Sequence, residues 1–172
     1  MTATELLKRD HAEIKALLAE LARATAMAPG ALAGRVRRQL IETLGNALDV
    51  HMELEHEMFY PAVREIEGAV SLVQAAELEH DEVRELLAVV LGMDAGDQDA
   101  AVKIDDLQKA FLHHASEEER LVFRKVRELD AAELERLGGE LADRKRELLD
   151  GTSVSLGRRP PRTGRRGSRR AA

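Results

Sequence analysis

The chain has 172 residues, enough for one domain with a sizeable core, and helix-forming residues dominate it while aromatics make up 2%. It has no cysteine, which excludes disulfides, iron–sulfur clusters and thiolate-bound zinc. The net charge of −6 is unevenly distributed, since residues 151–172 carry seven arginines and no acid, which leaves −13 for residues 1–150. Such an acidic body is a poor surface for binding nucleic acid. Charges in the first ten residues argue against a signal peptide, and apolar runs are too short to span a membrane. We therefore expect a soluble, cytoplasmic protein.

The first two predicted helices cover residues 4–27 and 32–67. Thr2 and Glu5 predict a capping box at the start of the first helix. Pro61 should kink the second helix or end its first segment. The apolar spacing predicts inward stripes formed by Leu7, His11, Ile14, Leu18 and Leu21, and by Ile41, Leu44, Leu48, His51, Glu55, Met58 and Ala62.

Three more helices are predicted over residues 70–91, 100–129 and 131–149. Asp130 with Glu133 predicts a cap for the last helix, and the pair Gly138-Gly139 should weaken its middle. The tail from residue 151 lacks large apolar residues and should be disordered. We expect an all-α fold, an antiparallel four-helix bundle over residues 1–150 with an appended C-terminal helix and a basic tail over 151–172. The stripes are Val70, Val73, Glu77, His80, Val83 and Leu87, then Ile104, Leu107, Phe111, His114, Glu118 and Leu121.

One pattern of histidine and acid occurs on two of these helices. His51 precedes Glu55, and His114 precedes Glu118, by four residues, so each pair stands on one helix face. Both pairs fall on the inward stripe, where isolated polar side chains are costly to bury. Two further inward histidines bring the candidate ligands to six, namely His11, His51, Glu55, His80, His114 and Glu118.

The helical spacing also separates neighbouring histidines. Residue 114 continues the stripe of Phe111, whereas His113 is about 100° round the helix. The same argument places His56 outside the candidate site. A second assignment pairs Glu118 with His113, five residues before it, and the spacing favours His114.

The chemistry of the candidate ligands limits which metal ions this site can bind. Imidazole and carboxylate without sulfur suit iron, manganese or zinc. Six ligands exceed the four of a closed zinc site and fit two metals that share bridging glutamates. We expect two iron ions per chain, with oxo or carboxylate bridges. The alternative, histidines paired only with buried acids, would be costly without a metal.

The ordered pattern resembles the hemerythrin-like family, the HHE cation-binding domain, over residues 1 to about 130. His11, His51 with Glu55, His80, and His114 with Glu118 match its signature in order, and Phe59-Tyr60-Pro61 is similar to its aromatic-proline ending. Arg124 stands where a second proline is often found. The oxygen carriers of the family have another histidine on the third helix, which this chain lacks.

The resemblance implies a nonheme di-iron centre that binds or reacts with dioxygen, peroxide or nitric oxide, in a stress response. A catalase-like activity is one expectation. Iron handling, or oxygen sensing without turnover, is the alternative. Three further features allow two interpretations each. Glu77 is either a metal ligand or a boundary acid, and Tyr60 is either a hydrogen-bond partner of the site or a packing residue; we prefer the second interpretation for both. The tail either contacts nucleic acid weakly or is a solvated extension, and we prefer the extension.

Overall fold

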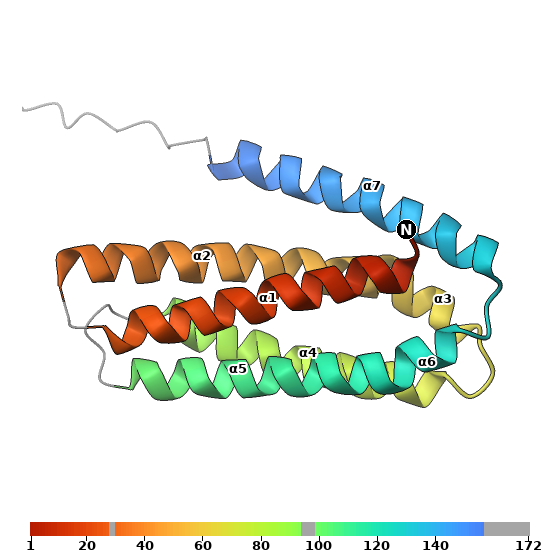
Figure 1. Ribbon diagram of the computed structural model, residues 1–172, viewed down its shortest axis with the longest axis horizontal. Helices are drawn as coiled ribbons and strands as arrows, with labels where there is room; N and C mark the ends of the chain where they lie inside the picture. The colour runs from red at the N-terminus through yellow and green to blue at the C-terminus, as the bar shows by residue number, and fades with distance from the viewer. Residues whose placement is uncertain (28–29, 94–98, 157–172) are drawn as a thin grey trace, which may run out of the picture.

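The computed structural model describes residues 1–27, 30–93 and 99–156, and the described chain is almost entirely helical (Figure 1). Two segments, η1 and η2, are single π-helical turns within longer helical rods. The elements in chain order are α1 (Ala3–Ala26), α2 (Ala31–Leu54), η1 (Glu55–Phe59), α3 (Tyr60–Arg64), α4 (Val70–Leu91), α5 (Ala100–Glu117), η2 (Glu118–Val122), α6 (Phe123–Val126) and α7 (Ala131–Leu156).

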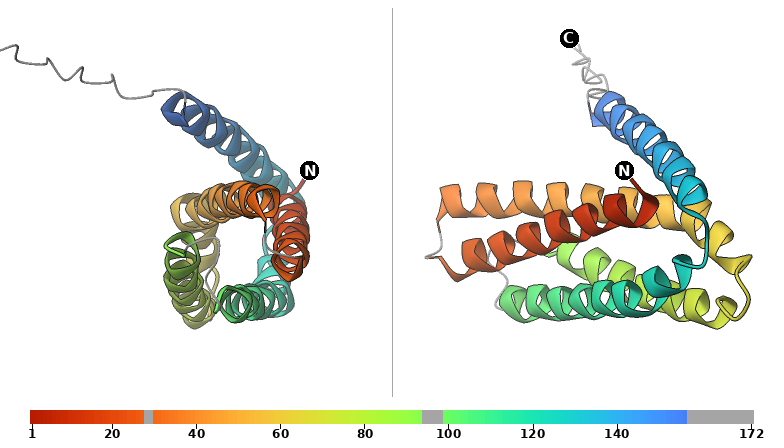
Figure 2. Two further views of the ribbon diagram at one scale, coloured as in Figure 1. Left: turned by 90° about the vertical axis from the view of Figure 1, so that its left-hand side faces the viewer. Right: turned by 45° about the vertical axis from the view of Figure 1, so that its right-hand side comes forward.

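The described residues form four helical rods, namely α1, α2 with η1 and α3, α4, and α5 with η2 and α6. These rods form an antiparallel bundle, as the sequence predicts. Seen end-on, α1 lies beside α2 and α5, and α4 closes the ring between α2 and α5 (Figure 2). The appended helix α7 lies outside this ring and packs on α1 and α2. Within the described residues, no helix is both long enough and apolar enough to cross a bilayer.

Local signals in the sequence fix several ends of the helices. The Thr2 hydroxyl accepts a hydrogen bond from the Glu5 amide at 3.3 Å, and Glu5 accepts one from the Thr2 amide at 2.8 Å, which completes the predicted capping box. Asp130 likewise accepts from the Glu133 amide at the start of α7. Gly68, with φ of 76°, makes the left-handed turn between α3 and α4.

Gly138 has a packing role that the sequence does not reveal. A Cβ at this position would lie 2.3 Å from the Met1 carbonyl oxygen, so only glycine lets α7 cross the N-terminal backbone so closely. Gly139, its neighbour, has nothing within 4 Å of such a Cβ. Gly138 is therefore the point where α7 crosses the N-terminal backbone. The weakening of the helix that we expect from its glycines applies to Gly139, which has no such packing role.

Among the described residues, the core consists of two apolar clusters with a polar layer between them. One cluster lies toward α3, α6 and α7 and includes Leu7, Leu54 and Val73. The other fills the opposite end and includes Ile14 and Leu48. Residues between these positions along each rod therefore lie at mid-depth. The six candidate ligands occupy this layer, each at most 1% exposed.

The π-helical turns shift the inward stripe by one residue. The backbone N–H of Tyr60 bonds to the carbonyl of Glu55, a five-residue step, and Phe123 bonds likewise to Glu118. Met58, Ala62 and Leu121, which were predicted to face inward, are therefore only half-buried, although Met58 and Ala62 still pack against the core. The residues buried in their place are Phe59, Val63 and Val122.

The structure differs from the prediction in several places near helix ends, and the helix predicted to end at residue 129 ends at Val126. Val70 is 47% exposed, because the inward line of α4 continues back from Val73 to Ala69. The second rod continues through Pro61 and ends at Arg64, because the wide turn of η1 takes up the proline. The last helix, α7, continues to Leu156, so its end lies beyond the expected boundary at residue 150. The rest of the expected tail, residues 157–172, lies outside the described residues.

Candidate metal centre

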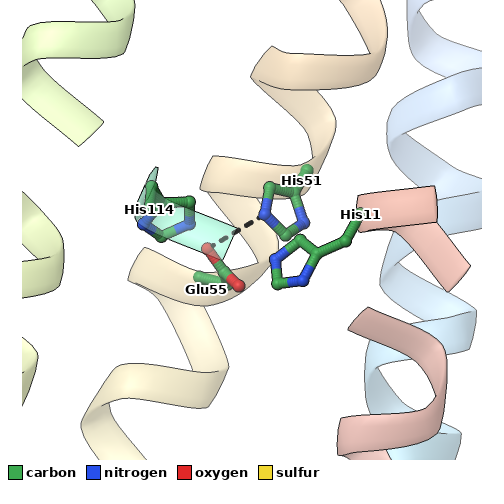
Figure 3. Close-up of side chains that lie close together, drawn as sticks. All are labelled: His11, His51, Glu55 and His114. Carbon is green, nitrogen blue, oxygen red and sulfur yellow. Dashed lines mark ion pairs between the residues drawn. The ribbon is translucent and has the colours of Figure 1, made fainter. Parts of the chain in front are cut away.

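Each rod of the bundle contributes to the polar layer. His11 comes from α1 and His80 from α4, while the other two rods each supply a histidine and the glutamate that begins their π-helical turn. In Figure 3 the rings of His11, His51 and His114 surround the carboxylate of Glu55. One ligand atom from each of these four residues lies within 4.8 Å of the others, a spacing that suits a bound cation.

Two further residues extend this cluster. His80 Nε2 lies 3.0 Å from Glu55 Oε2 and 3.1 Å from His114 Nε2. Glu118 Oε2 lies 3.3 Å from His11 Nε2. Because Glu55 Oε2 also lies 3.4 Å from His51 Nε2, this carboxylate stands between two imidazoles from different rods. All six candidates predicted from the sequence are thus brought together.

Several inward atoms of the cluster have no hydrogen-bond partner among the described residues. The contact of His11 Nε2 with Glu118 is short but lacks hydrogen-bond geometry, so both atoms remain unsatisfied. Buried polar atoms left in this way cost free energy that a cation would recover. The donor set, imidazole nitrogen and carboxylate oxygen, fits iron, manganese or zinc. The unsatisfied inward atoms are His11 Nε2, His51 Nε2, Glu55 Oε1 and both oxygens of Glu118, and the outer nitrogen of His51, Nδ1, is unsatisfied as well.

Three of the four histidines are held from outside through their other ring nitrogen. His11 Nδ1 lies 3.0 Å from Glu119 Oε1, which also contacts Lys15 Nζ at 3.3 Å. His114 Nδ1 lies 3.3 Å from Glu79 Oε2. Such outer contacts orient metal-binding imidazoles and fix which nitrogen offers its lone pair.

The third outer contact involves a histidine that the sequence places outside the site. His80 Nδ1 lies 3.2 Å from His56 Nε2, and His56 itself is about one-third exposed. Behind it, Glu77 lies 3.5 Å from His56 Nδ1 and is bonded to Arg64. Glu77 therefore lies outside the cluster as a boundary acid, the interpretation that the sequence favours.

Burial sets the protonation of the centre. It lowers the pKa of His51 well below the usual range, and the other three histidines and Lys145 lower it further. The pKa of His80 is lowered in the same way, first by burial and then by His114. Both imidazoles are therefore neutral at neutral pH, the form that binds metals. Burial, and next the Glu118 carboxylate, raise the pKa of Glu55 well above its usual value.

Tyr60 belongs to the centre, so the preferred interpretation of it as a boundary packing residue is wrong. It is fully buried, and its hydroxyl lies 3.3 Å from both Glu55 Oε2 and His80 Nε2. The π-helical turn is the cause, since it returns the fifth residue after Glu55 to the same face. Burial, then Glu55 and Glu118, raise the pKa of Tyr60, so it is a neutral hydrogen-bond donor.

The two halves of the chain complete each other's sites. His80 stacks on Tyr60 with ring centroids 5.6 Å apart, and His11 stacks on Phe123 at 5.8 Å. Tyr60 and Phe123 each follow a cluster glutamate by five residues. The histidine of α1 thus packs against η2 and α6, whereas the histidine of α4 packs against η1 and α3. A phenol on one side and a phenyl ring on the other make the two sides chemically different.

The neighbouring histidines of α5 separate as the spacing predicts. His114 is buried in the cluster, whereas the side chain of His113 is 65% exposed and lies 3.4 Å from Glu79 Oε1. Sequence reasoning missed the outer partners Glu79 and Glu119. Their only sequence signal is proximity to inward histidines, and many exposed acids of this chain share that signal.

The comparisons with known proteins agree with this geometry. The hemerythrin HHE cation binding domain matches residues 2–126. The chain belongs to this family. Among solved structures, a hemerythrin HHE cation binding domain-containing protein from Mycobacterium kansasii is similar, with 28% identity and a TM-score of 0.77, and the match covers 91% of this chain and 92% of that chain. Among curated proteins, none matches. The family match stops before α7, which begins at Ala131.

Proposed function

We propose that this hemerythrin-like protein holds a nonheme di-iron centre that binds and reacts with small oxidants, namely dioxygen, peroxide or nitric oxide. The observation that carries the proposal is the buried cluster with unsatisfied inward atoms. Its six donors exceed the needs of one closed tetrahedral site and suit a pair of metal ions. The proposed ligands are His11, His51, Glu55, His80, His114 and Glu118.

The residues around the proposed metals favour small ligands. Bound iron would supply an electron-rich centre with positions open to an oxidant. The six donors are at most 1% exposed, and apolar clusters close the layer on both sides, so a large substrate has no route without rearrangement of the bundle. Glu55 contacts imidazoles from two rods, so it would be available as a ligand to the proposed metals from the middle of the layer. The Tyr60 hydroxyl donates a hydrogen bond into the same space.

A reactive centre, rather than a stable oxygen carrier, fits the ligand count. On α4 the residues one turn either side of His80 are Ala76 and Arg84, so no second histidine of that helix completes the coordination. Iron that lacks a ligand keeps a position open to an oxidant. Cytoplasmic peroxide or nitric oxide removal is therefore our proposed role, with a catalase-like activity as its enzymatic form.

Elemental analysis and optical spectra test this proposal. We expect about two iron atoms per chain after growth with iron, as bundle di-iron sites hold, and a spectrum that changes with peroxide or nitric oxide. One zinc per chain under these conditions would contradict the di-iron assignment. A stable, reversible oxygen adduct without peroxide consumption would favour a carrier, and iron release without any reaction would favour iron handling.

A matched set of variants tests the ligand assignment on α5 and η2. His114→Ala and Glu118→Ala each remove a buried inward donor and should abolish most iron binding. His113→Ala and Glu117→Ala change the adjacent outward residues and should leave iron content unchanged. Iron loss in His113→Ala with retention in His114→Ala would show that Glu118 pairs with the histidine five residues before it.

A further inference from the structure

Asp10 is a buried acid beside the metal centre that the family signature does not include. It precedes His11 on α1 and is 5% exposed. Its Oδ1 accepts a hydrogen bond from Lys145 Nζ of α7 at 2.6 Å. Its Oδ2 has no hydrogen-bond partner among the described residues. A buried carboxylate with one oxygen unsatisfied calls for a second donor.

His51 has a ring nitrogen that lacks a hydrogen-bond partner, which complements the unsatisfied oxygen of Asp10. The outer nitrogens of His11, His80 and His114 have partners on the protein, whereas Nδ1 of His51 has none among the described residues. In Figure 3 the ring nitrogen of His51 that is turned away from Glu55 lies on the side of α1 and α7. This is the side from which Lys145 reaches Asp10.

Packing brings the helices of these groups together. The rings of His11 and His51 lie 4.8 Å apart, so Asp10, the residue before His11, borders the same seam. The helices α1, α2 and α7 pack on one another along it. Lys145 is also close enough that its charge contributes to the lowered pKa of His51, after burial and the neighbouring histidines.

We propose that Asp10 is the positioning residue of His51, accepting a hydrogen bond from its Nδ1–H directly or through one water molecule, while Lys145 of α7 holds the other carboxylate oxygen. The inference rests on the proposed metal centre for its purpose, because a proton on Nδ1 leaves the Nε2 lone pair pointing inward. It also gives α7 a role in the centre, although the family match ends before this helix.

The tautomer of His51 tests the proposal without any metal. Long-range ¹⁵N–¹H spectra of the metal-free protein report which ring nitrogen carries the proton, and His51→Gln identifies the signal. We expect Nδ1–H in the unmodified protein and in Asp10→Asn, whose amide oxygen still accepts. Asp10→Leu should shift the proton toward Nε2, and Lys145→Met should do so to a smaller extent. An unchanged His51 tautomer in Asp10→Leu would overturn the proposal.

Metal affinity gives a second readout, with zinc as a diamagnetic probe. Asp10→Leu should weaken zinc binding by about 10- to 100-fold, the usual effect of losing an outer partner of a metal ligand. Glu57→Gln breaks the ion pair with Arg144, another bridge from the bundle to α7, and serves as the control for helix docking. Its affinity should match that of the unmodified protein.

Each outcome has a distinct meaning. If Glu57→Gln weakens zinc binding as much as Lys145→Met does, docking of α7 explains the effect and the positioning role is wrong. If Asp10→Leu does not fold, Lys145→Met still tests the proposal, and an unchanged His51 tautomer in that variant would overturn it. If the unmodified protein binds no metal, the proposed function fails, while the metal-free spectra still test the Asp10–His51 bond.

Discussion

The metal-free protein should lose stability as the pH falls below 6.5, because of two buried histidines, while a buried glutamate acts in the opposite direction. The acid side follows from His51 and His80, whose folded-state pKa values lie below the ordinary 6.5. Below pH 6.5 the unfolded chain therefore takes up two protons that the folded chain refuses. Each proton lowers the free energy of unfolding by about 1.4 kcal/mol per pH unit.

Glu55 acts in the opposite direction. Its folded-state pKa lies well above the ordinary 4.5, so from pH 4.5 upward the folded chain retains a proton that the unfolded chain has released. Stability then falls by about 1.4 kcal/mol per pH unit until the folded-state pKa is reached. Just below pH 6.5 the two histidines outweigh Glu55 by at least one proton, which leaves a net gain of at least about 1.4 kcal/mol per unit with rising pH.

Above pH 6.5 the contribution of the two histidines is exhausted, so a further decline with rising pH comes, among these three groups, from Glu55. His56, whose pKa is also lowered by burial, adds to the acid side only. Urea unfolding of chelator-treated protein from about pH 5.5 to about pH 8 measures both sides. Glu55→Gln should remove the decline above pH 6.5. A stability that rises steadily to pH 8, or an unchanged decline in Glu55→Gln, would refute the reasoning.

Three further outcomes are expected. Gly138→Ala should lower the free energy of unfolding by about 1–3 kcal/mol through overpacking against the N-terminal backbone, whereas Gly139→Ala should raise it by up to about 1 kcal/mol, as thermal melts would show. Truncation after Leu156 should leave the melting temperature and metal content unchanged, since the buried residues that the structure describes precede that point, and a large fall in either would contradict this. Chelation should lower the melting temperature, and Zn²⁺ at about a thousandfold over its Kd should restore about 4 kcal/mol; a chelator without effect would argue against a metal centre.

The helices and the inward ligands could be predicted because both follow local rules. Capping at Thr2 and Asp130 marks helix starts, and the three-and-four spacing of α1 and α5 turns His11 and His114 inward. Each of these signals lies within one helix and needs no knowledge of its neighbours. The ordered set of ligands then supports the family resemblance without any three-dimensional information.

The π-helical turns could not be predicted from the same rules. A period of 3.6 residues cannot represent an extra residue, so every inward residue expected after Glu55 and Glu118 was displaced by one. Pro61 accompanies one turn, but Arg124 stands at the matching position of the other, so no residue type marks both. The role of Tyr60 could not be predicted for this reason. In a regular α-helix, a residue five positions after Glu55 would lie on a different face of the helix.

Partners that come from distant helices were hidden for a different reason. Asp10 and Lys145 are 135 residues apart, and each alone is an ordinary charged helix residue. Glu119 stands in a row of three glutamates, where the spacing selects Glu118 but cannot show that its neighbour faces His11. Only the packing of whole rods against one another brings these side chains together.

The exchange of stacking partners between the two halves has a consequence during synthesis of the chain. When only the first half of the chain has been synthesised, the available donors are His11, His51 and Glu55. Phe123, on which His11 stacks, has not yet been made. Such an incomplete set holds a cation loosely and leaves it open to water. For the proposed di-iron centre, capture of a redox-active ion would therefore wait until both halves of the bundle have met, and its chemistry would begin only inside the closed bundle.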